Sequence, residues 1–203
     1  MKRVELEKNY WNICALDPDV DQKYICDLDD DQRSKAIGKL SGRVLEIGCG
    51  IGRLLKPHWF GIDISQRMLD IAKQKRADCN FMLCNGRTIP YESEYFDNVY
   101  CVLVFQHIPF DGFVQYVQEV ARVLKDSGQF VFQIIEGKVE GDFSQHYNLE
   151  EVLKTLKSAG FIVTSQKKGL VHEQWVWIKA KKGGNEASKY LGLKEIPLFS
   201  TKV

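Results

Sequence analysis

Three glycines and one carboxylate are the residues of this chain best suited to chemistry. Gly48, Gly50 and Gly52 alternate after the apolar run 44–47, and Asp63 ends the next apolar run eleven residues later. Glycine lets the backbone pass close to a ligand where a Cβ would clash. A carboxylate at the tip of a strand can accept both hydroxyl protons of a ribose. Together the strand, the turn and the carboxylate predict a nucleotide cradle.

Apolar runs of strand length recur along the chain and alternate with helical patterns. The expected strands are residues 44–47, 59–63, 80–84, 98–104, 129–135, 161–166 and 175–180. Helical patterns begin after the candidate caps Ser65 and Asn148 and at Asp111. We therefore expect an α/β fold with a doubly wound, mostly parallel sheet and right-handed crossovers. The last two runs predict a hairpin that inserts one antiparallel strand.

The connection between the first two strands is unusually short. Only residues 48–58 join them, close to the lower limit of about a dozen residues for a parallel connection. Pro57 also forbids a long helix there. We expect one or two helical turns in this connection, and we expect the N-terminal segment to cover the face of the sheet that they leave thin.

Composition narrows the functional classes. The 203 residues suit one α/β domain, and the net charge of +1 gives no long-range attraction to nucleic acid or to an anionic membrane. The six cysteines form no C-x-x-C pair, so we expect no metal site. Free thiols fit a reducing compartment, and no run reaches the roughly 20 apolar residues of a membrane helix. We expect a cytoplasmic monomer or homodimer with no nucleic-acid or membrane partner.

Five segments, taken in order, resemble the motifs of class I S-adenosylmethionine-dependent methyltransferases of the small-molecule type. They are VLEIGCGIG at 44–52, GIDIS at 61–65, FDNV at 96–99, RVLKDSGQ at 122–129 and SAGF at 158–161. Each motif is short, and the signal lies in their order and spacing. The resemblance implies a Rossmann-like sheet of seven strands. It also implies methyl transfer from S-adenosylmethionine to a small-molecule acceptor, an O, N or C nucleophile, by in-line displacement.

The resemblance also implies a domain organisation. Residues 1–40 would be an N-terminal helical segment that caps the site, and residues 41–180 would be the cofactor-binding domain. Residues 181–203 lose periodicity and are expected to form a flexible tail.

The cofactor-binding residues follow from the same motifs. By resemblance they are Glu46, Gly48, Cys49, Gly50, Gly52, Asp63, Ile64, Met68, Asn85, Gly86, Leu103 and Val104. Asp63 would bind the ribose hydroxyls, and Ile64 and Met68 would contact the adenine. Asn85 stands where the family usually has an aspartate for the adenine amino group, so the charge assistance of that contact is lost.

The acceptor pocket is expected from the least patterned segments. The candidate catalytic residues are His107, which follows the fourth expected strand, and His146, in a polar loop before the last helix. His107 would act as a base or only line the pocket, since loops at the carboxyl end of such a sheet hold ligands. The candidate pocket residues are Tyr10, Trp11, Phe105, His107 and Glu136.

Two other functions stay open at this point. A methyltransferase fold without activity could serve as a partner subunit, although such proteins typically lose the glycines or the ribose carboxylate, and both are present here. A nicotinamide-dependent oxidoreductase would carry G-x-G-x-x-G, with the pyrophosphate at a helix N-terminus. Here the spacing is G-x-G-x-G.

Overall fold

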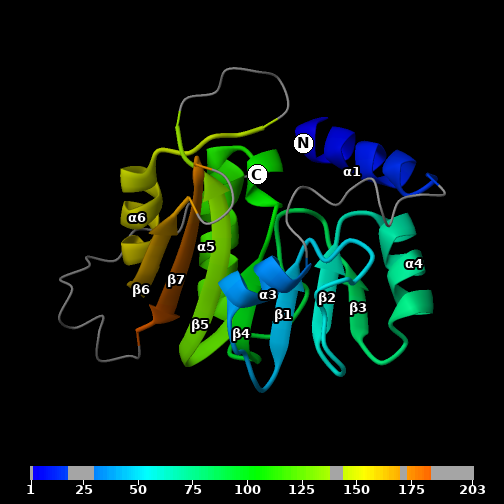
Figure 1. Ribbon diagram of the computed structural model, residues 1–203, viewed down its shortest axis with the longest axis horizontal. Coiled ribbons are helices and arrows are strands. Elements are labelled where there is room, and N and C mark those ends of the chain that lie inside the picture. Colours follow the sequence, from blue (N-terminus) through cyan, green and yellow to red (C-terminus); the bar gives the residue numbers. More distant parts are fainter. Residues whose placement is uncertain (1, 18–29, 138–143, 170–172, 184–203) are drawn as a thin grey trace, which may run out of the picture.

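Seven strands form one sheet with helices on both faces in the computed structural model, which describes residues 2–17, 30–137, 144–169 and 173–183 (Figure 1). The strands are β1 Val44–Ile47, β2 Phe60–Asp63, β3 Asn80–Leu83, β4 Phe96–Cys101, β5 Leu124–Ile135, β6 Phe161–Lys168 and β7 Trp175–Lys182. The helices are α1 Lys2–Cys14, α3 Asp30–Ile37, α4 Gln66–Lys75, the 3-10 turn η1 Phe105–His107, α5 Phe110–Val123 and α6 Leu149–Ser158.

The strand order is β3-β2-β1-β4-β5-β7-β6. Strands β1 to β5 pair in parallel, and β7 pairs antiparallel with both β5 and β6. This confirms the predicted doubly wound, Rossmann-like sheet and its antiparallel C-terminal strand. The order reverses between β1 and β4, and ligands of open α/β sheets bind at the carboxyl ends of the strands at such a point.

Side-chain caps start two of the helices where the sequence predicted them. The Ser65 side chain accepts a hydrogen bond from the Met68 backbone N–H at 3.2 Å and begins α4. Asn148 does the same for Glu151 at 3.1 Å and begins α6. Helix α5 begins at Phe110, one residue before the predicted start at Asp111.

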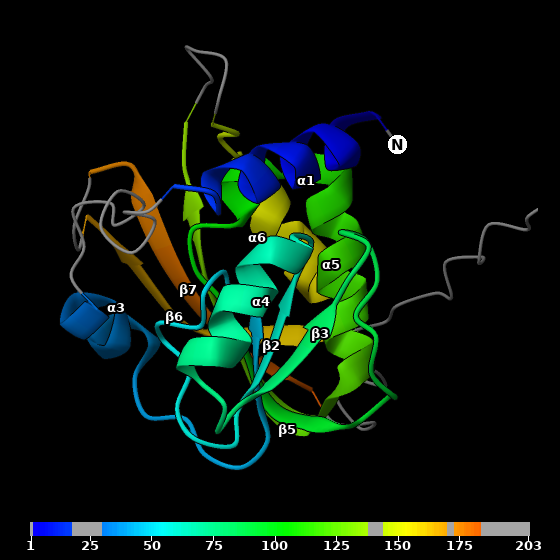
Figure 2. The same ribbon diagram turned by 90° about the vertical axis from the view of Figure 1, so that its right-hand side faces the viewer.

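Each face of the sheet has its own apolar core. On one face, α5 and α6 bury residues such as Val117 and Leu156 against the phenylalanines of β5. On the other face, Leu55 and Trp59 from the β1–β2 connection, together with Ile37 of α3, pack against the sheet. The two views place α3 and α5 on opposite sides of the sheet (Figures 1 and 2). The expectation that the N-terminal segment covers the thin face is therefore confirmed for α3.

The prediction of one or two helical turns between β1 and β2 is wrong. Residues 48–58 form only turns, because Gly48, Gly50 and Gly52 all have positive φ angles that a right-handed helix does not accept. The connection is held by packing instead. Gly61 of β2 has no Cβ, and this lets the side chains of Cys49 and Leu55 rest directly on the strand.

Two further boundaries differ from the prediction. Strand β5 begins at Leu124, not at 129, because Leu124 already pairs with Phe96 and a bulge interrupts the ladder before Gln129 pairs with Asn98. Strand β7 continues through Lys182, two residues into the segment that was expected to be a tail. The rest of that expected tail, residues 184–203, lies outside the described residues.

Helix α1 lies above α4 and the carboxyl end of β2 in both views (Figures 1 and 2). It is attached there through Cys14, which packs with Ile51 and Met68 in a small separate cluster. Within the described ranges, no helix is long and apolar enough to cross a membrane.

The packing at Gly61 yields a stability prediction. In Gly61→Ala the new Cβ would lie 2.7 Å from Cys49 Sγ and 3.0 Å from Leu55 Cδ1. We expect the free energy of unfolding to fall by about 1–3 kcal/mol, as is usual for overpacking. Urea unfolding of both proteins measures the difference. Equal stabilities would contradict the tight packing of residues 48–58 on β2.

Candidate functional site

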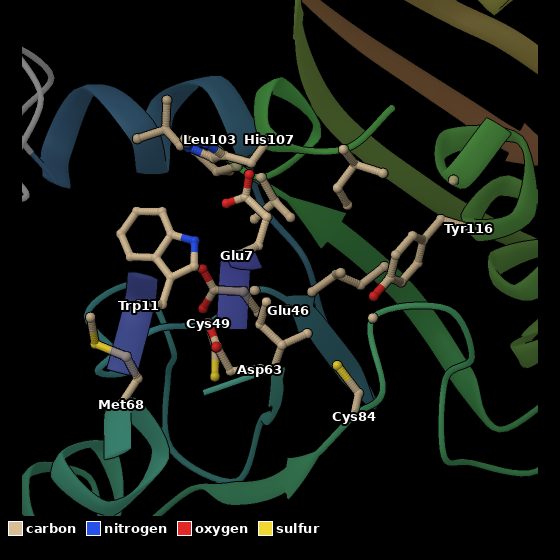
Figure 3. A pocket seen from close by; sticks show the side chains of 18 of the residues that line it. Glu7, Trp11, Glu46, Cys49, Asp63, Met68, Cys84, Leu103, His107 and Tyr116 are labelled. Carbon is tan, nitrogen blue, oxygen red and sulfur yellow. The ribbon is translucent and has the colours of Figure 1, made fainter. Parts of the chain in front are cut away.

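A cavity of about 360 Å³ lies at the carboxyl ends of β1, β2 and β4 (Figure 3), and residues of α1 form part of its wall. This volume falls within the range of about 300–1,000 Å³ that small-molecule sites occupy. Its wall contains residues from the turn after β1, the end of β2, the turn after β4 and the start of α5. The site is therefore where the sheet topology predicts it.

Asp63 ends β2 and binds the glycine turn. Its Oδ2 accepts a hydrogen bond from the Gly50 N–H at 2.9 Å, and its Oδ1 accepts one from the Ser65 N–H at 2.8 Å. The residue is 7% exposed and lies on the cavity wall. Burial raises the pKa of the carboxyl, and the N–H groups of Ser65 and Gly50 oppose that rise. Each oxygen keeps lone-pair capacity for a further donor.

Position 48 requires glycine because the side chain of Val104 lies too close for a Cβ. Its φ angle is +68°, and a Cβ at this position would collide with the side chain of Val104. The N–H groups of Gly48 and Cys49 both donate to the Ile62 carbonyl, at 2.8 and 3.0 Å. The turn after β1 is thus fixed to β2 and to the turn after β4 at the same time.

The end of β4 is held by a residue that sequence reasoning missed. The strand ends at Cys101, not at Val104 as predicted, because Leu103 adopts a left-handed φ of +62°. The Leu103 N–H donates to Gln133 Oε1 at 3.2 Å, and Gln133 is fully buried. This bond fixes the turn that brings Leu103 and Val104 to the cavity.

Most of the predicted cofactor residues are brought together in the cavity wall. They are Glu46, Gly48, Cys49, Asp63, Ile64, Met68, Gly86, Leu103 and Val104. Of the predicted acceptor residues, Trp11 and His107 join the same wall.

Three predicted cofactor residues lie outside the wall. Gly50 contributes its N–H to Asp63, and a Cβ there would meet open space. Gly52 faces Phe81 instead of the cavity. Asn85 uses its side-chain oxygen locally, accepting hydrogen bonds from the N–H groups of Arg87 and Thr88, at 2.9 and 2.8 Å.

Four predicted acceptor-side residues also lie elsewhere. Tyr10 is 48% exposed on the outer side of α1. Phe105 is buried in the core against Phe113. Glu136 forms an ion pair with Lys168 at 2.6 Å. His146 follows Gln145, whose N–H donates to the Gln106 carbonyl, and it does not reach the cavity wall.

Helix α1 presents one face to the cavity. Arg3, Glu7 and Trp11 recur at a spacing of four residues and all line it. Sequence reasoning identified Trp11 but missed the other two, although the four-residue spacing was a usable signal. It also missed Arg33 of α3, which lines the cavity and is 5% exposed.

His107 is electrically neutral at physiological pH. Burial, and secondarily the charge of Arg3, lower its pKa from 6.5 to about 4. The Trp11 ring packs edge-on against the imidazole, with centroids 5.3 Å apart (Figure 3). Burial has the opposite effect on Glu7 and raises the pKa of its carboxyl, while Arg3 and Trp11 oppose that rise.

The cavity thiols are not reactive nucleophiles. Burial raises the pKa of Cys49 well above its usual value and that of Cys84 to about 11. Nowhere in the described part of the chain do three His, Cys, Asp or Glu side chains gather as metal ligands would.

The comparisons with known proteins agree with this geometry. A family model described as a methyltransferase domain matches residues 45–132. An uncharacterized protein of Methanocaldococcus jannaschii is 33% identical over 138 residues, which are 59% of this chain and 64% of that protein. The ubiquinone biosynthesis O-methyltransferase of Hahella chejuensis is 29% identical over 137 residues, 62% of this chain and 56% of that enzyme. The chain thus spans less than two thirds of the length of these relatives.

A solved structure shows the same fold at lower identity. The magnesium protoporphyrin IX methyltransferase of Synechocystis, with bound SAH, superposes with a TM-score of 0.70 at 16% identity, covering 89% of this chain and all of that one. The matched model covers the strands that carry the glycine turn and Asp63, and these are the residues that the fold brings to one cavity. The chain is thus similar to methyltransferases in sequence over residues 45–132 and in fold.

Proposed function

We propose that this protein transfers a methyl group from S-adenosylmethionine to a small-molecule acceptor. The observation that carries the proposal is the buried carboxylate of Asp63, held by two backbone N–H groups on the wall of a cavity beside the glycine turn. When bound, the cofactor supplies a methyl group activated by its sulfonium charge.

The residues of the cavity fit such a cofactor. The remaining lone pairs of Asp63 suit the two hydroxyls of a ribose. Ile64 and Met68 give an apolar wall for a flat base, and the guanidinium of Arg33 suits a carboxylate. The turn at Leu103 and Val104 brings backbone to the opposite side, where the methyl end would lie.

The position of α1 along the cavity supports a small acceptor molecule. Residues of the helix form one wall of the cavity, so an acceptor must fit beneath or beside the helix. A closed site also keeps water from the reacting atoms. Two relatives carry names of small-molecule enzymes, the ubiquinone O-methyltransferase and the demethylmenaquinone methyltransferase of Thermotoga maritima.

The first experiment measures cofactor binding and then turnover. Calorimetry with S-adenosylmethionine and with NADH distinguishes the methyltransferase from the oxidoreductase. A panel of amines, phenols, carboxylic acids and thiols, with detection of S-adenosylhomocysteine, then tests turnover. Absence of S-adenosylmethionine binding would refute the proposal, and binding without turnover on any class would favour the silent partner subunit.

Asp63→Asn tests the assignment of the ribose carboxylate. Loss of a charged acceptor should weaken S-adenosylmethionine binding by about 1–3 kcal/mol, roughly 5- to 150-fold. Calorimetry gives the dissociation constant, and thermal unfolding shows whether the variant is folded. The matched control is Asp70→Asn on the exposed side of α4, which should bind normally. Equal affinity in both variants would remove Asp63 from the cofactor site.

The buried His107 predicts a pH dependence of stability. Because its folded pKa of about 4 is below the usual 6.5, the unfolded chain binds more protons between these values. Stability from this group is present above pH 6.5 and is lost as pH falls toward 4, by up to about 3 kcal/mol. Urea unfolding between pH 4 and 7 should show a shallower slope in His107→Gln than in the wild type. Titration of the His107 imidazole near pH 6.5 by NMR would contradict its burial.

A further inference from the structure

Glu7 brings a carboxylate from outside the sheet into the cavity. In Figure 3 its side chain extends from α1 toward Leu103 and His107, with Glu46 and Asp63 on the other side. Glu5, two residues away on the same helix, is exposed. The only acid that α1 contributes to the cavity wall, within the described part of the chain, is therefore Glu7.

The other cavity carboxylates near Glu7 are committed to the fold. Glu46 accepts a hydrogen bond from the Tyr100 hydroxyl at 3.0 Å. Asp63 accepts from the N–H groups of Gly50 and Ser65. Glu7 lies on α1, which contacts the segment after β4 through Trp11 and His107, on the side where the methyl end is proposed to lie.

We propose that Glu7 is the catalytic base, which takes the proton from an acceptor N–H or O–H group as that nitrogen or oxygen receives the methyl group. The inference rests on the proposed function. In the balanced reaction the S–CH₃ bond breaks with its electron pair left on sulfur, and a bond from the methyl to the acceptor atom forms. The acceptor proton goes to a Glu7 oxygen, from which water removes it after the product leaves.

The electrostatics of the cavity suit Glu7 to this role better than His107. Burial raises the pKa of Glu7, which makes its carboxylate a stronger base, whereas the pKa of His107 falls to about 4. His107 is then a neutral hydrogen-bonding group beside the acceptor. The titratable and charged groups that share the cavity wall with Glu7 are Arg3, Arg33, Glu46, Cys49, Arg53, Asp63, Cys84, Arg87, His107, Asp111 and Tyr116.

The decisive test does not need the natural acceptor. The protein is labelled with ¹³C at glutamate carboxyl carbons, and Glu7→Gln and Glu5→Gln assign the two resonances. Both groups are titrated in the complexes with S-adenosylmethionine and with S-adenosylhomocysteine, which differ by the methyl group and one positive charge.

A carboxylate beside the transferred methyl must respond to that charge. We expect the pKa of Glu7 to be lower in the S-adenosylmethionine complex by roughly 0.5–1 unit, the effect of one charge several ångström away in a partly hydrated cavity. The pKa of Glu5 should be the same in both complexes. Equal Glu7 values in two complexes that calorimetry shows to be formed would overturn the proposal and leave the proposed function intact.

Turnover and affinity give the second measurement. With the acceptor found in the panel, Glu7→Gln should lower kcat by about 100-fold or more, the usual effect of removing a general base. Its dissociation constant for S-adenosylmethionine should rise by about three- to tenfold, because the interaction that lowers the pKa of Glu7 also stabilises the bound cation. Its dissociation constant for S-adenosylhomocysteine should stay within about twofold of the wild type, and Glu5→Gln should match the wild type in all three measurements. A Glu7→Gln variant that turns over normally would show that Glu7 is not the base.

Discussion

The two hydrogen bonds that Asp63 accepts are the constraint on which the site depends. A buried carboxylate is costly unless donors satisfy it, and here the donors are backbone N–H groups of Gly50 and Ser65. One bond fixes the turn after β1, and the other fixes the start of α4. The cavity floor is therefore a single unit, in which the carboxylate joins two segments that also pack on each other through Ile51 and Met68.

The connection between β1 and β2 limits which class of nucleotide ligand the site can bind. Dinucleotide sites place a pyrophosphate at the N-terminus of the helix that follows the first strand. Residues 48–58 contain no helix, and the N–H groups of Gly48 and Cys49 are already bonded to Ile62. This connection thus offers no helix N-terminus for a pyrophosphate. This absence argues against a nicotinamide cofactor and is compatible with an adenosyl group held by its ribose.

The sequence predicted the sheet well because local signals decide it. Apolar runs, the caps at Ser65 and Asn148, and the glycine turn each act within a few residues. The site was harder to predict where packing between distant segments determines which side chains face the cavity. Tyr10 and Glu7 are both plausible pocket residues by type, and only the rotation of α1 over the sheet turns one outward and the other inward. The left-handed Leu103 depends on Gln133, thirty residues away.

Three acids of the cavity wall come from two places: Glu7 from α1, and Glu46 and Asp63 from the strands of the sheet. Glu46 and Asp63 lie in the floor, where both accept hydrogen bonds from groups of the fold. A reaction that consumes a positive charge in a cavity screened from bulk water leaves any nearby fixed carboxylate without its counter-charge, which is unfavourable at low dielectric. A carboxylate that gains a proton in the same step avoids this cost, because the local charge sum is unchanged. Glu7 lies on a helix outside the sheet, where protonation disturbs no bond within the core. If Glu7 is the base, as proposed, the acids in the floor keep their hydrogen bonds to the fold while the acid on α1 takes up the proton, so that one cavity could both hold a cation and consume it.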